Sequence, residues 1–293
     1  MKNIAVYGKK VNKSTAPYFL QILQTIEKFS WKVVLEKELK EQLEKKLGQL
    51  PFCDTFNHFS DFTTGIDLVL SVGGDGTFLK TVKYIRNSGV PIVGVNTGRL
   101  GFLASVNTEN LESVFQQIKN KNFDYQHRSM LKIDTNQQLF GEDNYAMNEV
   151  TLHKKDTASM ITVHVKLDDN YLNSYWADGL IVSTPTGSTA YNLSCGGPIV
   201  TPGCQIHILT PIAPHNLNVR PMVVPDKFPI KLSVEGRERK CLISIDSISK
   251  NINQGEEVIV TKASFLINVV KFYDSNFLDT IRKKMSWGMD QRN

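Results

Sequence analysis

The sequence predicts two domains of different class, an α/β domain followed by an all-β domain. The chain has 293 residues, which suits one large or two ordinary domains because single cores stop growing at roughly 250–300 residues. In residues 1–124, short apolar runs alternate with helical patterns. In residues 125–274, short segments rich in β-branched residues are separated by Pro, Gly, Asn and Asp.

The first domain is expected to contain a parallel sheet covered by helices on both faces, because its strands and helices alternate along the chain. The predicted strands are Ile4–Tyr7, Lys32–Leu35, Ile66–Val72 and Pro91–Val95. The predicted helices are Pro17–Phe29, Glu36–Leu47, Thr77–Arg86 and Leu111–Asn120.

The second domain is predicted to be all-β, and the chain then ends in a helix. Its expected strands are Met160–Leu167, Leu180–Ser183, Ile206–Leu209, Ile230–Val234, Lys240–Ile245 and Glu257–Lys262. The tail is expected to be helical over Ser275–Met285, with an apolar face of Phe277, Leu278, Ile281 and Met285. Because a lone helix has to bury such a face, residues 275–293 are expected to return to the first domain.

Composition is that of a soluble globular protein, with 41% hydrophobic and 22% charged residues and a net charge of +5. No dense basic run indicates nucleic acid, and no segment reaches the ~18 apolar residues of a membrane span. The N-terminus does not have the pattern of a signal peptide, and none of the four cysteines lies in a CxxC pair. These features predict a cytoplasmic protein with reduced thiols and without a zinc site, a membrane or a nucleic-acid partner.

The strongest local motif is Gly73-Gly74-Asp75-Gly76-Thr77, which follows an apolar strand and opens a helix. Its glycines allow backbone amides to approach phosphate oxygens at the carboxyl end of a parallel strand. It differs from the GxxxxGK[ST] phosphate loop because no lysine follows the glycines. Asp75 either accepts a proton from an attacking hydroxyl or caps the helix, and the surrounding run of small residues favours the first role.

Two further motifs lie in the predicted β domain. Residues 178–200 are rich in Ser, Thr and Gly, which suits sugar hydroxyls and phosphates, although turns use the same residues to satisfy their backbones. Asn148-Glu149 pairs an amide with a carboxylate that can fix two ribose hydroxyls, or it is an ordinary strand-edge pair. The histidines His153, His164, His207 and His215 lack the spacing of metal ligands.

Taken together, five segments in order resemble the bacterial ATP-NAD kinase family over nearly the whole chain. Gly73–Thr77 is similar to its GGDGT motif, Asn148-Glu149 to its NE motif, and residues 178–200 to its DG…TPTGSTAY…GGP motif. The stretches 96–103 and 214–221 also resemble family segments. GGDGT alone is moderately specific, because lipid kinases and phosphofructokinases carry relatives of it, whereas the long motif is highly specific.

The resemblance implies a Rossmann-like α/β domain followed by a β-sandwich, with an active site between them. That site is completed by a neighbouring subunit of a homo-oligomer, a dimer or a tetramer. The implied reaction moves the γ-phosphoryl group of ATP to the 2′-hydroxyl of the adenosine ribose of NAD, which yields NADP. A divalent cation, magnesium, is implied to bridge the ATP phosphates rather than to bind protein ligands.

Residue roles follow from the same resemblance. Asp75 is implied to accept the proton of the 2′-hydroxyl, and Gly73, Gly74, Gly76, Thr77 and Lys80 to lie beside phosphates. Asn148 and Glu149 are implied to hold the ribose region of NAD, and Asp178 the nicotinamide side or the second ribose. The residues implied to line the adenine pocket are Thr186, Thr189, Ala190, Tyr191 (stacking), Asn192, Leu193 and Ser194, with apolar contacts from Phe102 and Ala213.

Three positions depart from the family pattern: Trp176 replaces a common arginine, Ile248 a polar amide and Asn268 a histidine. These changes bear on tolerance of NADH, regulation by NADPH and the outline of the pocket. The two rival classes are a lipid kinase and a non-catalytic dinucleotide sensor. A lipid kinase predicts an exposed apolar membrane-facing segment, and a sensor is free to lose the carboxylate of Asp75.

Overall fold

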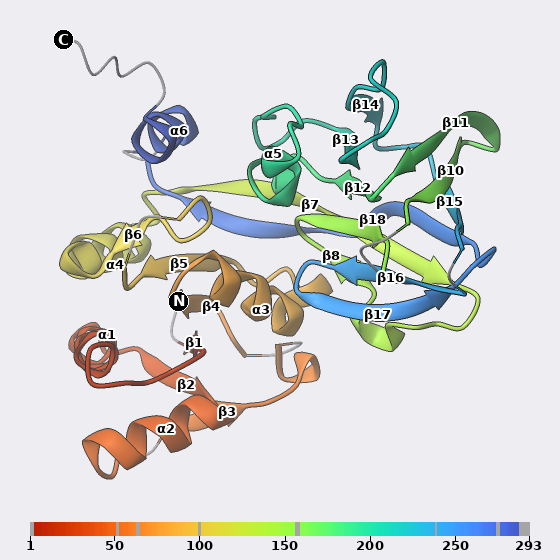
Figure 1. Ribbon diagram of the computed structural model, residues 1–293. Coiled ribbons are helices and arrows are strands. Elements are labelled where there is room, and N and C mark those ends of the chain that lie inside the picture. Colours follow the sequence, from red (N-terminus) through yellow and green to blue (C-terminus); the bar gives the residue numbers. More distant parts are fainter. Residues whose placement is uncertain are drawn as a thin grey trace. The chain divides into compact units, whose positions relative to one another are not determined.

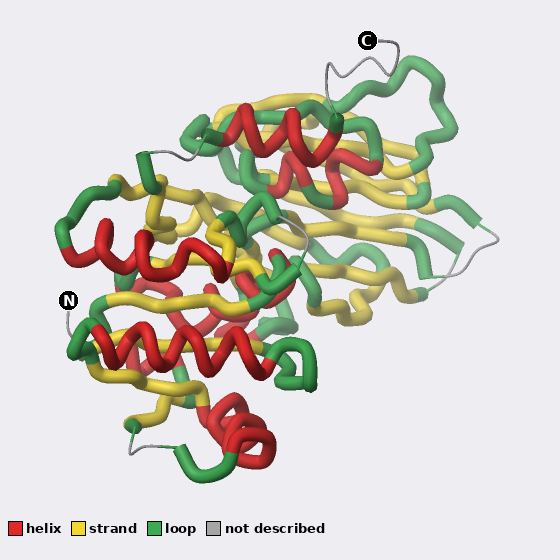
Figure 2. The backbone as a smooth tube through the Cα atoms, turned by 90° about the vertical axis from the view of Figure 1, so that its left-hand side faces the viewer, coloured by secondary structure: helices red, strands yellow, loops and turns green. Residues whose placement is uncertain are grey.

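The computed structural model describes residues 3–50, 53–62, 65–98, 101–155, 159–237, 239–273 and 276–286. Arg99 and Leu100 of the family-like stretch 96–103, and the tail positions 275 and 287–293, lie outside the described residues. The chain forms two compact units, Met1–Gln126 with Ile267–Asn293, and His127–Leu266. The sequence prediction placed the borders after residues 124 and 274. Figure 1 shows the two units coloured by position along the chain, and Figure 2 shows them coloured by secondary structure.

The first unit contains a parallel sheet in the order β5-β4-β1-β2-β3. Its strands are β1 (Asn3–Gly8), β2 (Lys32–Glu36), β3 (Asp54–Phe56), β4 (Leu68–Val72) and β5 (Ile92–Asn96). The short strand β6 (Val106–Asn107) also pairs with β5 in parallel. In this unit the end of β18 (Val258–Lys271) joins β5 in parallel through Val269.

Helices cover both faces of this parallel sheet. They are α1 (Ala16–Lys28), α2 (Lys37–Leu47), α3 (Asp75–Ile85) and α4 (Leu111–Lys119). Ile4 and Val6 of β1 join one buried cluster with α1, α2 and α4. Because side chains alternate along a strand, Tyr7 faces the other way, where its ring lies 5.4 Å from that of Tyr84 on α3. The predicted α/β architecture is confirmed.

The second unit is a β-sandwich. One antiparallel sheet has the order β14-β13-β12-β9-β16-β17, and the other contains β11-β10-β15-β18 with β7 and β8 attached. One buried cluster takes inward side chains from both sheets, as a sandwich requires. The strands are β7 (Asp124–Thr135), β8 (Tyr145–Ala146), β9 (Glu149–His153), β10 (Ile161–Leu167), β11 (Asn170–Ala177), β12 (Gly179–Ser183), β13 (Ile206–Ile212), β14 (Met222–Pro225), β15 (Ile230–Glu235), β16 (Lys240–Ile245) and β17 (Ile248–Asn253).

Two details of the element predictions need correction. Helix α3 begins at Asp75, two positions before the predicted start, because Gly74 serves as its N-cap. In the terminal helix α6 (Phe277–Met285), Ile281 is buried but Leu278 and Met285 are 50% and 40% exposed, so the expected apolar face is narrower. No helix in the described part of the chain is both long and apolar enough to cross a membrane.

Candidate active site

The glycine turn of the first unit joins β4 to α3. Gly73 has a φ of +150°, and a side chain there would collide with Thr77. Its N–H donates to the carbonyl of Val95 on β5 (2.8 Å), which ties the turn to the neighbouring strand. Gly74 is the N-cap residue and Asp75 the first residue of α3. The turn therefore presents the start of a helix at the carboxyl ends of two adjacent parallel strands, where anions bind well.

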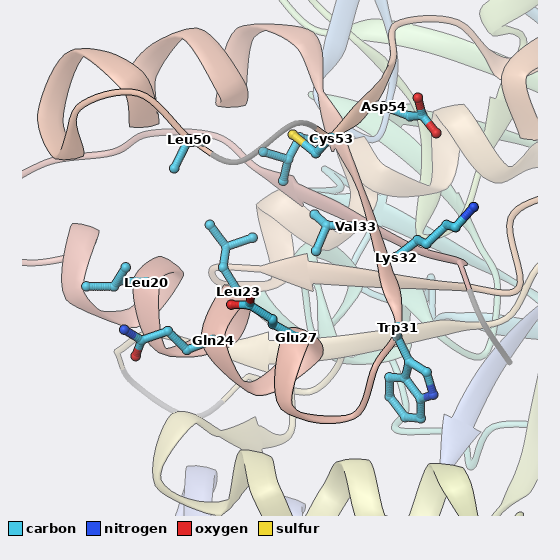
Figure 3. A pocket seen from close by; sticks show the side chains of 11 residues that line it. Leu20, Leu23, Gln24, Glu27, Trp31, Lys32, Val33, Leu50, Cys53 and Asp54 are labelled. Atoms are coloured by element: carbon cyan, nitrogen blue, oxygen red, sulfur yellow. The ribbon is translucent and has the colours of Figure 1, made fainter.

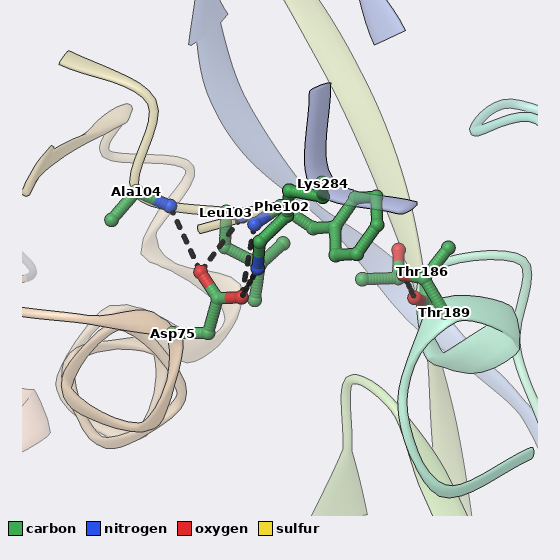
Figure 4. Close-up of polar contacts among 7 residues, drawn as sticks. All are labelled: Asp75, Phe102, Leu103, Ala104, Thr186, Thr189 and Lys284. Carbon is green, nitrogen blue, oxygen red and sulfur yellow. Dashed lines mark hydrogen bonds and ion pairs between the residues drawn. The ribbon is translucent and has the colours of Figure 1, made fainter. Parts of the chain in front are cut away.

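The carboxylate of Asp75 is held by three successive backbone N–H groups, which we call the Asp75 cradle: those of Phe102, Leu103 and Ala104. Phe102 donates to Oδ2 (2.9 Å), while Leu103 and Ala104 donate to Oδ1 (2.9 and 3.2 Å; Figure 4). The alternative in which Asp75 merely caps its own helix is therefore wrong, since α3 has no side-chain cap. The side chain remains one-third exposed (33%), so a substrate atom can reach it.

Two glycines give the Asp75 cradle its close fit. A Cβ at Gly101 would run into Oδ1 of Asp75. A Cβ at Gly94 on β5 would lie only 2.6 Å from the Cα of Ala104. Real Cβ atoms do not approach other atoms so closely, so the loop can reach both the strand and the carboxylate only because these positions lack side chains.

Lysines surround the turn. Partial burial lowers the pKa of Lys80 on α3, and the positive charge of Lys9 lowers it further. On α6, the Nζ of Lys284 lies 4.0 Å from Oδ2 of Asp75. This side of the first unit therefore combines a carboxylate with several positive charges.

In the second unit, Asp246 holds the Asn148-Glu149 motif through its backbone. We call its three donors the Asp246 cradle: the N–H groups of Met147, Asn148 and Glu149, at 2.9, 2.9 and 3.2 Å. Asp246 occupies the tight turn between β16 and β17 and has a φ of +46°. The motif is thus fixed by a residue about a hundred positions away in the sequence.

Glu149 is a buried carboxyl group whose pKa is raised to about 8. Burial is the main cause, the negative charge of Asp246 adds to it, and a hydrogen bond from the backbone N–H of Tyr191 opposes it. Among the described residues, Oε2 of Glu149 finds no hydrogen-bond partner. Near neutral pH this carboxyl group is therefore largely protonated, and it can donate a hydrogen bond as well as accept one.

The Ser- and Thr-rich segment packs directly on the same motif. Thr184 donates through Oγ1 to the carbonyl of Met147 (2.6 Å), and its N–H donates to the carbonyl of Asn148 (2.9 Å). A side chain at Gly187 would strike that same carbonyl of Asn148. The structure thus brings two of the predicted site motifs into backbone contact.

Residues of the predicted adenine pocket fall into two groups in the structure. Asn192 is fully buried, and its side chain is engaged by Ser188, Pro198 and Thr210. Tyr191 is 40% exposed, as a stacking ring requires. The remaining members are Thr186 (buried, accepting from Arg128 at 3.3 Å), Thr189, Ala190 and Leu193 (partly exposed) and Ser194 (exposed). Asn192 is therefore a buried, hydrogen-bonded residue of this segment, whereas Tyr191 is presented to solvent.

Asp178 follows β11 and is paired with Lys154, whose Nζ lies 2.6 Å from Oδ1. Their side chains are 27% and 16% exposed, respectively. Ala213 has a φ of +44°, a backbone conformation that costs a non-glycine residue energy and is found preferentially at functional sites.

The three departures from the family pattern lie in different settings. The ring of Trp176 is half exposed and lies 4.1 Å from that of His215. Ile248 packs against the sandwich core. Asn268 belongs to the first unit and donates to the carbonyl of Gly89 (2.9 Å).

Other parts of the molecule lie apart from these residues. A cavity of about 550 Å³ in the first unit is bordered by α1, β2 and β3 and includes Trp31 and Cys53, but none of the predicted site residues lines it (Figure 3). Across the described ranges, no group of three or more His, Cys, Asp or Glu side chains is arranged to hold a metal ion.

Sequence reasoning missed Asp246, Lys154, Arg128 and Lys284 as neighbours of the predicted site residues. A turn aspartate after a β-strand is a weak local signal for Asp246. No local signal identifies the others, because their partners lie far away in the sequence.

Comparisons with known proteins agree with the division into two parts. Residues 4–123 match the ATP-NAD kinase N-terminal domain, and residues 147–272 match the ATP-NAD kinase C-terminal domain. A curated NAD kinase from Christiangramia forsetii is 44% identical over 292 residues, covering 99% of both chains. One from Bacteroides fragilis is 37% identical over 288 residues, covering 98% of this chain and 99% of the relative.

Solved structures show the same fold. Yeast NADH kinase complexed with NADH superposes with a TM-score of 0.88 at 24% identity, covering 99% of this chain and 89% of that one. An NAD kinase from Archaeoglobus fulgidus in complex with ATP gives 0.75 at 26% identity, covering 97% and 98%. The fold is thus the two-domain fold of NAD kinases. With both domains matched and full-length relatives at 37–44% identity, the chain belongs to the ATP-NAD kinase family.

Proposed function

We propose that the protein transfers the γ-phosphoryl group of ATP to the 2′-hydroxyl of the adenosine ribose of NAD, giving NADP and ADP. The observation that carries this proposal is the carboxylate of Asp75, fixed by three backbone N–H groups in a glycine turn yet one-third exposed. Family membership supplies the donor and the acceptor.

Asp75 acts in this proposal as the proton acceptor for the attacking hydroxyl. Oδ2 of Asp75 accepts only one cradle bond and still has accepting capacity, because an ionised carboxylate offers about four lone-pair sites, two on each oxygen. The Asp75 cradle fixes the direction in which the carboxylate points, so an approaching hydroxyl meets it without a search over rotamers. General base catalysis of this kind contributes about 10²–10⁴-fold in rate.

The phosphates of ATP are proposed to lie against Gly73, Gly74, Gly76 and Thr77 at the start of α3. Backbone N–H groups at a helix start favour anions, and the closely placed Lys9 and Lys80 relieve their mutual repulsion when an anion binds. A divalent cation, for which we propose magnesium, would reach the site on the ATP phosphates and neutralise part of their charge.

NAD is proposed to be held by residues of the second unit. The protonated carboxyl of Glu149 can donate to a ribose oxygen while the amide of Asn148 serves a second one. Asp178 would accept from the nicotinamide side or the other ribose. The proposed adenine contacts are Thr186, Thr189, Ala190, Leu193 and Ser194 with the ring of Tyr191 stacking, Asn192 as wall, and Phe102 and Ala213 as apolar contacts. We also propose a homo-oligomer, dimer or tetramer, in the cytoplasm.

The test is an assay of the purified full-length chain with ATP, magnesium and NAD, with NADP measured by a coupled dehydrogenase. We expect NADP to form in proportion to the ADP released. Phosphate transfer to diacylglycerol without NADP would contradict the proposal in favour of a lipid kinase. Tight NAD binding by calorimetry with no turnover would contradict it in favour of a dinucleotide sensor.

A further inference from the structure

Helix α6 contacts the Asp75 cradle through side chains that share one helical face. Phe277, Ile281 and Lys284 are spaced i, i+4 and i+7, which places them in one row along the helix. The ring of Phe277 lies 6.4 Å from that of Phe102, and Ile281 is buried. Phe102 therefore holds the carboxylate through its backbone N–H and packs its ring near α6.

Lys284 reaches the same oxygen that the cradle holds. Its Nζ lies 4.0 Å from Oδ2 of Asp75 and 4.6 Å from the centre of the Phe102 ring (Figure 4). Phe102 also donates its backbone N–H to Oδ2. One ammonium group therefore faces the carboxylate and the residue that orients it.

This arrangement differs from that of an ordinary surface lysine. The side chain of Lys284 is only 29% exposed, although a lysine on the last turn of an exposed helix can extend fully into water. A cation over an aromatic face is attracted by the ring quadrupole, and the carboxylate attracts it from a second direction. The neighbouring Lys283 lies at the same basic end of the helix and provides a matched comparison.

We propose that Lys284 is a positioning residue for phosphoryl transfer. Its ammonium group steadies Oδ2 of Asp75 and the ring of Phe102, so that the cradle keeps the carboxylate aimed at the acceptor hydroxyl. The proposal rests on the role of Asp75 given under Proposed function. Without the ammonium group, Phe102 and the carboxylate gain freedom, and small misplacements of a reacting group cost up to about 10²-fold in rate.

Three variants separate charge from packing. Lys284→Met keeps an unbranched apolar stem over Phe102 but removes the charge. Lys284→Arg keeps the charge and can still stack on the ring. Lys283→Met removes one charge from the same helix end without touching Asp75, and it controls for net charge and helix stability.

Initial rates should be measured for the full-length enzyme at saturating ATP, magnesium and NAD. We expect Lys284→Met to lower kcat roughly 5- to 30-fold with the KM for NAD within about twofold, because positioning acts on the transition state rather than on ground-state binding. Lys284→Arg should recover kcat to within about threefold of the wild type, and Lys283→Met should match the wild type. A Lys284→Met enzyme with wild-type kcat, or a Lys284→Arg enzyme as slow as Lys284→Met, would overturn the proposal.

Hydrogen exchange supplies a readout that does not depend on activity. The amide of Phe102 should exchange roughly tenfold faster in Lys284→Met than in the wild type, with no change in Lys283→Met, because the hydrogen bond to Oδ2 opens more often. Unchanged exchange would overturn the positioning role even where kcat falls. Failure of the proposed function looks different: the wild type would form no NADP while the exchange pattern holds.

Discussion

Asp75 of the first unit and Asp246 of the second each accept hydrogen bonds from three successive backbone N–H groups of a distant segment. The donors are Phe102–Ala104 in one case and Met147–Glu149 in the other. Both aspartates lie in turns at the end of a β-strand. The hydrogen-bond pattern around the two carboxylates is therefore the same: the first N–H donates to Oδ2 and the next two donate to Oδ1.

Their neighbours differ in charge, and that difference separates their roles. Asp75 faces the ammonium group of Lys284 and remains open to solvent on one side. Asp246 lies beside a second acid, Glu149, and raises the pKa of that group together with burial. A cradle of amides therefore fixes where a carboxylate points, whereas, under the proposed function, the nearby charge decides whether it serves as a reacting group or tunes another residue.

The largest expected effect comes from Asp75→Asn. We expect kcat to fall by about 10²–10⁴-fold if the carboxylate is the proton acceptor, while NAD binding is largely kept. Calorimetry with NAD and a thermal melt serve as controls, because the amide nitrogen of Asn would face one of the donating N–H groups of the cradle. Near-normal turnover would remove Asp75 from the catalytic step.

Gly101→Ala tests the Asp75 cradle without altering the carboxylate chemically. The new methyl group would meet Oδ1 of Asp75, the movable end of a side chain, so the carboxylate should shift while the fold survives. We expect kcat to fall roughly 10- to 100-fold with only a small loss of Tm. Gly98→Ala is the matched control, since a Cβ there meets nothing within 4 Å. Equal losses of kcat in both variants would argue against the cradle.

Glu149→Gln tests the second region through the pH dependence of stability. The folded pKa is about 8, against an ordinary value of 4.5. Between these values the folded state binds the proton that the unfolded chain releases, so stability is full below pH 4.5 and declines as pH rises through 8. From pH 6.5 to 8 the free energy of unfolding of the wild type should fall by about 1–2 kcal/mol through this group.

The window above pH 6.5 avoids a second buried group. Burial lowers the pKa of His207 from 6.5 to about 4, which gives stability that rises with pH only between those values. Urea denaturation at several pH values should therefore show a flatter profile for Glu149→Gln than for the wild type above pH 6.5. If stability falls equally with pH in the wild type and in Glu149→Gln above pH 6.5, Glu149 is not the group that keeps its proton in the folded state.

The smallest effect is expected from Lys154→Met, which removes the ion pair with Asp178. Because both side chains are partly exposed, the loss of stability should be at most about 1 kcal/mol. The KM for NAD should rise roughly two- to fivefold as Asp178 loses its orientation, with kcat little changed. An unchanged KM would mean that Asp178 does not contact NAD.

Much of the fold could be predicted because the order of apolar and polar residues within short stretches of sequence indicates its strands and helices. The apolar runs that became β1, β4 and β5, and the helical spacing of α1 and α4, are properties of short windows. Strands β3, β8 and β14 escaped prediction because they have only two to four residues, and segments this short carry too little periodicity to be recognised. The longer strands β7, β11 and β17 also escaped prediction, because they are rich in polar residues and lack a regular apolar-polar alternation.

The site could be predicted only as far as its motifs are contiguous. The glycine turn and the Asn148-Glu149 pair are visible in the sequence, whereas Asp246 lies about a hundred positions from the backbone that it holds. Nothing in the sequence separates Lys283 from Lys284, and only the packing of Lys284 on the ring of Phe102 distinguishes one lysine from the other. Long-range contacts of this kind depend on tertiary structure.

The close approach of Gly94 to the backbone of Ala104 has a consequence for engineering this enzyme. The loop 101–104 cannot be replaced alone by the loop of a relative, because Gly94 of β5 and the carboxylate of Asp75 set its position. The transferable part is a set of three pieces: the β5 strand, the loop 101–104 and the glycine turn. Libraries that vary other positions of the first unit but keep these three pieces together should yield a larger share of active clones than libraries that exchange the loop alone.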